Sequence, residues 1–128
     1  MRVQLDKDEP LIVIPVSLTG KVAKYIVNMA LDTGATFVMI PWDVAERLGY
    51  DPKLSQEMVS ITTASTVEKV PVINIEEFNV LGHSKRNIKV VVHDLPPTSR
   101  VDGLLGLNFL NNFNLKLMFN KGYLELSK

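Results

Sequence analysis

The sequence contains no cysteine, only two histidines and no excess of charge of either sign. The lack of cysteine excludes disulfides, thiolate zinc sites and a cysteine nucleophile. His83 and His93 are too few for a histidine metal cage. Fourteen basic and fourteen acidic residues give a net charge of zero. This charge balance offers no electrostatic surface for nucleic acid and no basic block for a membrane surface.

The chain also lacks a long uninterrupted apolar run. A membrane-spanning helix needs about 20 apolar residues, and the nearest candidate, residues 25–42, carries Asp32 at its centre together with a glycine and a proline. Residues 1–9 hold five charges and no apolar core of a signal peptide. We therefore expect no signal peptide or membrane span in this chain, which favours a cytoplasmic location. Residues 1–9 are a candidate charged tail.

Short apolar runs separated by turn residues make up most of the sequence. Residues 11–18 and 22–31 flank Thr19-Gly20-Lys21 and predict a first hairpin. Further strands are predicted at 37–40, 57–63, 66–73, 76–81, 84–93, 115–119 and 123–126.

Two short helices interrupt the predicted strands. One is expected at residues 41–48, where Pro41 suits the first helical position and Gly49 suits the stop, and the other at 108–112. A chain of 128 residues with this pattern predicts a single all-β, barrel-like domain over its whole length.

Asp32 is the one charged residue within residues 25–42, and apolar runs flank it on both sides. A carboxylate among core strands costs free energy unless it is paired, hydrogen-bonded or protonated. The small residues that follow, Thr33, Gly34 and Ala35, leave the carboxylate accessible and let backbone N–H groups approach it. Taken alone, an Asp-Thr-Gly sequence more often marks an Asx-type turn between two strands.

A second motif follows about 70 residues later, Asp102-Gly103-Leu104-Leu105-Gly106, and leads into the second short helix. Together with Leu31-Asp32-Thr33-Gly34-Ala35, it resembles the retroviral-type aspartic proteases, the retropepsin-like family, and most of all the single-domain bacterial and archaeal members. The resemblance extends over roughly residues 11–126. It implies a closed retropepsin-like β-barrel of short strands, with one or two short helices, in one domain spanning residues 1–128.

By this resemblance, Asp32 is the catalytic carboxylate of an aspartic endopeptidase. Thr33 ties two active-site loops together across a dimer axis, Gly34 approaches the substrate backbone and Ala35 completes the loop. The segment Leu104-Leu105-Gly106 packs against the Asp32 loop and holds it. The implied substrate is an extended peptide or unfolded polypeptide, and no metal or organic cofactor is implied.

The chemistry that the resemblance implies needs two carboxyl groups. Peptide hydrolysis without a covalent intermediate uses one carboxylate to activate water and a second carboxylic acid to protonate the carbonyl oxygen. The chain has one Asp-Thr-Gly and no second such motif, so the pair requires two chains around a twofold axis. We therefore expect a homodimer. Residues 122–126 are predicted either to offer an unpaired edge to a second copy or simply to close a hairpin with 115–119.

The candidate flap is a predicted hairpin whose tip comprises Thr62, Thr63, Ala64, Ser65 and Thr66. It lacks the glycine that flap tips of the family usually carry, and Thr36 stands where retroviral members have an acidic residue that binds the substrate backbone. These departures leave open a non-catalytic member that binds peptides or dimerises. A plain structural β-domain, with Asp32 in an ordinary turn, is the third interpretation.

Three further polar residues are candidate functional groups, namely Asp102, His83 and His93. Asp102 is a candidate second carboxylate, although an Asp-Gly after a proline-rich loop more often marks a turn. His83 and His93 have no serine in a nucleophile elbow beside them, so a Ser-His-Asp assembly has little support. Ala35 has no hydroxyl to hydrogen-bond the carboxylate, which predicts optimal activity at mildly acidic pH, about 4–6.5.

Overall fold

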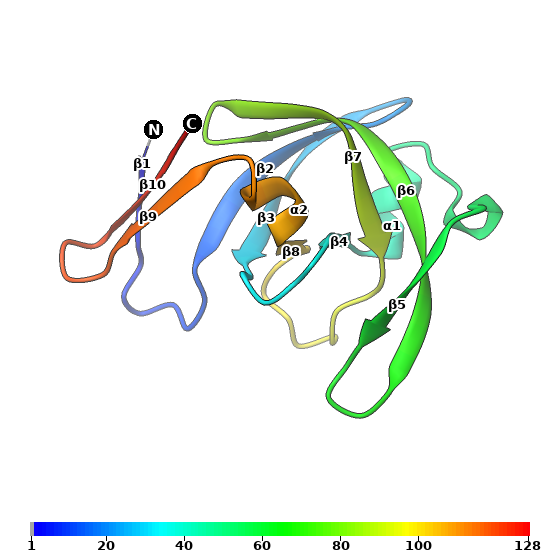
Figure 1. The fold of residues 1–128 in the computed structure, drawn as a ribbon, viewed down its shortest axis with the longest axis horizontal. Coiled ribbons are helices and arrows are strands. Elements are labelled where there is room, and N and C mark those ends of the chain that lie inside the picture. Colours follow the sequence, from blue (N-terminus) through cyan, green and yellow to red (C-terminus); the bar gives the residue numbers. More distant parts are fainter. Residues whose placement is uncertain (1) are drawn as a thin grey trace.

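A computed structural model describes residues 2–128, and most of its regular structure is β-strand (Figure 1). The strands in this range are β1 (Arg2–Gln4), β2 (Val13–Thr19), β3 (Lys24–Leu31), β4 (Val38–Ile40), β5 (Met58–Thr62), β6 (Val67–Val80), β7 (His83–Val92), β8 (Leu104–Leu105), β9 (Asn114–Met118) and β10 (Tyr123–Ser127). The helical elements are α1 (Trp42–Arg47), α2 (Leu107–Leu110) and the 3-10 turn η1 (Pro52–Leu54). Within residues 2–128, no helix has the length and apolar character that a membrane crossing requires.

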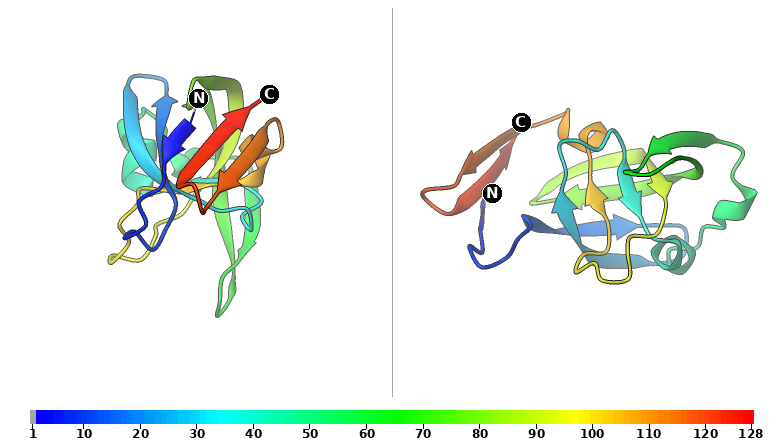
Figure 2. Two further views of the ribbon diagram at one scale, coloured as in Figure 1. Left: turned by 90° about the vertical axis from the view of Figure 1, so that its left-hand side faces the viewer. Right: turned by 90° about the horizontal axis from the view of Figure 1, so that it is seen from below.

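Seven of the strands form one sheet in the order β2-β3-β8-β4-β7-β6-β5. Strand β6 also pairs with β2, through residues 77–80 and 16–19, and this pairing closes the sheet into a barrel. Strand β5 stands at the end of the order and forms a hairpin with the first part of β6 that projects from the barrel (Figures 1 and 2). The predicted all-β barrel with short helices is confirmed.

Strand β6 differs from the prediction. The sequence predicts two strands, at 66–73 and 76–81, but the structure has one continuous strand of 14 residues. Ile75 is fully buried and pairs with Ile88 of β7, and Glu77 pairs with Arg86. The interval at residues 74–75 therefore stays in the ladder, because Asn74 and Ile75 pair with Lys89 and Ile88 of β7. This length allows β6 to belong both to the barrel and to the projecting hairpin.

The two ends of the chain form a separate sheet in the order β1-β10-β9, beside the barrel (Figure 2). The prediction that residues 122–126 present an unpaired edge is wrong, because β10 pairs with β9 on one side and with β1 on the other. Arg2 adds contacts with β10, since its guanidinium lies 3.4 Å from a Glu125 carboxylate oxygen and 4.0 Å from the centroid of the Tyr123 ring. Residues 2–4 of the candidate charged tail are thus a strand.

The main apolar core fills the barrel and is covered at its ends by the short helices. Phe78 of β6 and Phe109 of α2 are fully buried, with ring centroids 5.1 Å apart. Helix α1 buries Val44 and Ala45, and Gly49 ends it in a left-handed conformation with φ of 98°, as the sequence predicts. Burial of each large apolar side chain contributes about 1.5–3 kcal/mol to folding, so this core holds the strands that carry the loops at the barrel's open side.

A smaller apolar cluster joins the projecting hairpin to the barrel. Its buried members are Val70 and Val72 of β6 and Val91 of β7. Partly buried side chains from β4, β5 and the preceding loop pack against them, namely Phe37, Met39, Val59 and Ile61. The hairpin, residues 58–71, is called the flap hairpin below.

Candidate active site

Asp32 directly follows β3, and the pairing of β3 with β8 fixes its position in the sheet. The last residues of β3, Ala30 and Leu31, pair in parallel with Leu104 and Leu105 of β8. The backbone N–H of Asp32 continues this ladder by donating to the carbonyl oxygen of Leu105, 3.0 Å away. The strand ladder therefore sets where the carboxyl group emerges from the barrel.

The Asp32 side chain is held by the turn that follows it. Its Oδ1 accepts a hydrogen bond from the backbone N–H of Gly34 at 3.0 Å, and its carbonyl oxygen accepts from the N–H of Ala35 at 3.2 Å. A Cβ atom at position 34 would lie 3.3 Å from Oδ1, so glycine permits this close approach. Asp32 is half-buried, whereas Thr33 and Gly34 are exposed. A fixed, solvent-accessible carboxyl group results.

The structure brings the predicted Leu104-Leu105-Gly106 segment against the Asp32 loop. A Cβ at Gly106 would collide with the carbonyl oxygen of Phe37 and lie 2.9 Å from that of Ala35, so only glycine allows these backbones to touch. At the start of α2, the N–H of Leu107 donates to the Ala35 carbonyl at 2.8 Å. Helix α2 and the Asp32 loop are therefore one hydrogen-bonded unit.

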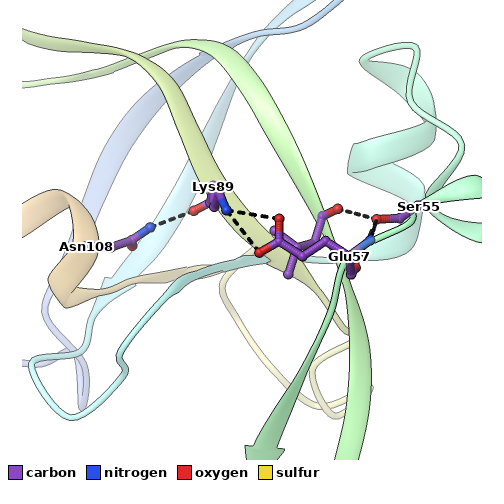
Figure 3. A network of polar contacts seen from close by, with 5 residues as sticks. Ser55, Glu57, Lys89 and Asn108 are labelled. Carbon is purple, nitrogen blue, oxygen red and sulfur yellow. Dashed lines mark hydrogen bonds and ion pairs between the residues drawn. The ribbon is translucent and has the colours of Figure 1, made fainter.

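The side chain of Asn108 connects α2 to strands β4 and β7, a role that the sequence alone does not indicate. Its side-chain Oδ1 accepts from the buried N–H of Val38 in β4 at 2.8 Å. Its Nδ2 donates to the carbonyl oxygen of Lys89 in β7 at 2.6 Å (Figure 3). Only the amide of asparagine or glutamine offers an acceptor and a donor side by side. The one signal in the sequence is the position of an asparagine directly after Leu-Leu-Gly-Leu.

The Asp32 carboxyl group lines a cavity of about 890 Å³ under the flap hairpin. Its apolar walls come from Phe37, Met39, Ile61, Val91 and Leu104, and its polar and small lining residues include Asp32, Gly34, Ala35, Thr36, Ser60, Thr62, Thr63, His93 and Asp94. The cavity is large enough for several side chains of a ligand, within the range of typical ligand sites.

The tip of the flap hairpin closes without glycine. The N–H of Thr63 donates to the Thr66 carbonyl at 2.8 Å, and the Thr63 hydroxyl both donates to that carbonyl at 3.0 Å and accepts from the Thr66 N–H at 3.1 Å. Residues 63–66 have no positive φ, so the turn does not need a glycine. Thr62 and Thr63 line the cavity, and Ala64 and Ser65 form the exposed tip beyond them.

The remaining candidates lie elsewhere. Asp102 lines a small depression with Tyr25 and Arg47, away from the Asp32 cavity, and its N–H donates to the Asn28 carbonyl at 2.7 Å. A turn residue is the better interpretation of Asp102. A ring nitrogen of His83 lies 3.0 Å from the Leu126 carbonyl oxygen, which links the β6–β7 turn to β10. Among residues 2–128, no three metal-ligating side chains cluster together.

Comparison with known proteins identifies the family. Residues 18–112 match the gag-polyprotein putative aspartyl protease family. The chain belongs to this family. The crystal structure of a retropepsin-like aspartic protease from Rickettsia conorii superimposes with a TM-score of 0.74 and 23% sequence identity, covering 98% of this chain and 88% of the other. The chain thus has the retropepsin-like fold that the sequence predicts.

A second similar protein is matched over only part of its own length. An uncharacterized protein encoded in the cobV 5' region of a Sinorhizobium species is 27% identical over 93 residues. The match covers 72% of this chain but only 39% of that protein, so the chain spans about two-fifths of the length of its relative.

Proposed function

We propose that this chain is an aspartic endopeptidase that acts as a homodimer, with the two Asp32 carboxyl groups facing each other at the twofold axis. The observation that carries the proposal is the Asp32 carboxyl itself. It is half-buried, oriented by the Gly34 N–H at 3.0 Å, and open to a cavity of about 890 Å³ beneath a projecting hairpin. Family membership supports the same chemistry.

In this proposal the two carboxyl groups share one proton, because two carboxylates about 3 Å apart cannot both ionise. The ionised Asp32 removes a proton from a water molecule as that water attacks the scissile carbonyl carbon. The protonated Asp32 donates its proton to the carbonyl oxygen, and the resulting tetrahedral intermediate collapses with protonation of the leaving amine. The Gly34 hydrogen bond keeps one carboxylate oxygen in place and reduces the reorganisation that the reaction requires.

An extended peptide suits the shape and edges of the cavity. Strand β5 is the last strand of its sheet, and its residues Ser60, Ile61 and Thr62 line the cavity. An unpaired strand edge can accept a peptide as an additional strand. The apolar walls, which include Phe37 and Met39, favour apolar substrate side chains next to the cleaved bond.

An exposed apolar patch near the Asp32 loop supports dimerisation. Leu11 and Phe119 are 45% and 63% exposed and line a groove of about 460 Å³ between the β1–β2 connection and the β9–β10 hairpin. This groove adjoins the site, because the carbonyl of Ile12 accepts a hydrogen bond from the N–H of Leu31 at 2.8 Å. A second copy placed against the patch would bury apolar surface beside the two Asp32 loops.

The proposal is tested with a diverse peptide library incubated at several pH values with wild type, Asp32→Asn and Asp102→Asn. Asparagine at position 32 keeps the side-chain shape but cannot act as a general base, so cleavage should stop. The matched change at Asp102, which lies outside the cavity, should leave cleavage intact. Equal cleavage by wild type and Asp32→Asn would refute the assignment. Peptide binding by wild type without cleavage would favour the non-catalytic peptide-binding module instead.

A further inference from the structure

The inner face of the flap hairpin continues onto β7. Strand pairing places Val59 opposite Val70, Ile61 opposite Glu68, and Val72 opposite Val91. Because side chains alternate along a strand, the residues that share this face are Glu57, Val59, Ile61, Glu68, Val70, Val72, Lys89, Val91 and His93. The apolar members are those of the small cluster that attaches the hairpin to the barrel. The remaining members are two acidic and two basic residues.

These four residues form two ion pairs, one on each side of the apolar cluster. Lys89 Nζ lies 3.0 Å from both carboxylate oxygens of Glu57, at the base of the flap hairpin (Figure 3). His93 Nε2 lies 3.4 Å from Glu68 Oε2, on the side nearer the flap tip. A lysine keeps its charge throughout the neutral range, whereas a histidine changes charge between about pH 5 and 8. Only the second pair can therefore respond to pH in that range.

His93 lies between the barrel, the Asp32 cavity and the flap hairpin. Its backbone N–H donates to the Ile40 carbonyl at 3.0 Å, so the residue is attached to the barrel, whereas Glu68 belongs to the flap hairpin. The His93 side chain is 31% exposed and lines the same cavity as Asp32. Of the other nearby carboxylates, Asp94 accepts a hydrogen bond from the N–H of Trp42 at 3.0 Å and Glu57 binds Lys89. Glu68 is left as the ion-pair partner of the imidazole.

We propose that His93 and Glu68 form a pH-dependent latch that holds the flap hairpin over the Asp32 cavity. The attraction is present when the imidazole is protonated and Glu68 is ionised, and it is lost as the imidazole becomes neutral. In mildly acidic solution both ion pairs and the apolar cluster hold the hairpin. In mildly alkaline solution the Lys89–Glu57 pair and the cluster remain, so the half of the hairpin nearer the tip opens more often.

Hydrogen exchange at the backbone amides of residues 58–71 tests the latch without any assumption about catalysis. After correction for intrinsic exchange rates, wild-type protection should fall about two- to fivefold between pH 5.5 and 8, the size expected of a partly exposed ion pair. His93→Gln, which retains polar character but no charge, should show low protection at both pH values. Glu68→Gln, at an exposed strand position, should do the same and provides a second variant if His93→Gln fails to fold.

Lys89→Gln is the matched control, because it removes the other ion pair of the same face. It should lower protection by a similar factor at both pH values and keep the wild-type ratio between them. A wild-type ratio equal to that of His93→Gln would overturn the latch, as would a Lys89→Gln variant that loses the pH dependence.

The expected effect of the latch on peptide binding rests on the proposed function. A closed flap hairpin favours bound peptide, so KM should rise two- to fivefold from pH 5.5 to 8 in wild type beyond any change seen in His93→Gln. Peptide affinity of the inactive Asp32→Asn chain should show the same difference. Equal pH dependence of binding with and without His93 would overturn the link between latch and substrate. Absence of cleavage with an intact exchange ratio would refute the peptidase and leave the latch in place.

Discussion

Replacement of Asn108 by alanine should destabilise the fold more than any other single polar change near the active site. The Asn108 amide supports two strands at once, since it accepts from the N–H of Val38 and donates to the carbonyl of Lys89. Alanine removes both the acceptor and the donor and leaves the N–H of Val38, a residue that is 0% exposed, without its partner.

The size of the effect follows from the burial of the two backbone groups. An unsatisfied buried N–H, as at Val38, costs about 1–3 kcal/mol, whereas the more accessible Lys89 carbonyl costs about 0.5–1 kcal/mol because water can replace the lost donor. The sum is about 1.5–4 kcal/mol. For a domain of this size, such a loss lowers Tm by about 5–15 °C.

Thermal and urea unfolding of wild type, Asn108→Ala and Asn111→Ala measure this loss. Asn111 is an exposed asparagine one turn along the same segment, and its replacement should cost less than about 0.5 kcal/mol. The active-site loop should also loosen in Asn108→Ala, with faster exchange at the amides of Asp32 and Leu107. Equal stability of the two variants would refute the bridging role of Asn108.

Three other perturbations follow from the same contacts. Gly106→Ala should lower stability by about 1–3 kcal/mol in urea unfolding, because its Cβ would collide with the Phe37 carbonyl; a neutral change would contradict the close approach. Phe119→Glu should raise the dimer dissociation constant at least about tenfold in sedimentation, whereas Leu54→Glu, at a similarly exposed apolar residue on η1, should leave it unchanged. The pH–rate profile should peak at about 4–6.5, where the proposed pair of Asp32 carboxyl groups would share one proton. A maximum in the alkaline range would contradict that chemistry.

Local sequence patterns predict most of the barrel because each strand carries its own alternation and turn residues. The glycine at 49 and the hairpin turn at residues 19–21 are local features, and the structure contains both. The predicted break at residues 74–75 of β6 is wrong. Asn74 has low strand propensity, but its place in the strand is set by pairing with Lys89 of β7. Strand β1 has three residues, too short for any periodic signal, and forms through pairing with β10.

The candidate site likewise contains residues that a local sequence pattern indicates and residues that it does not. Asp32 stands out in the sequence because a lone carboxylate in an apolar stretch followed by small residues is a local pattern. Asn108 and the His93–Glu68 pair do not stand out. Asn108 is 19 residues from Lys89 and 70 from Val38, and His93 is 25 residues from Glu68, so these groups meet only through strand register. The flap tip shows how a departure from a family pattern is accommodated, since the Thr63 hydroxyl closes the turn that a glycine would otherwise make.

The central claim, two Asp32 carboxyl groups from two chains in one active site, is tested most directly by mixing chains. Wild type is held at a concentration where the dimer is saturated, and a ninefold excess of Asp32→Asn is added and equilibrated. If mixed dimers are inactive, about one tenth of the original activity should remain, because about one wild-type chain in ten then has a wild-type partner. Asp102→Asn in the same excess should cause no such loss. Undiminished activity in the presence of Asp32→Asn, at a concentration where sedimentation shows mixed dimers, would contradict the shared site.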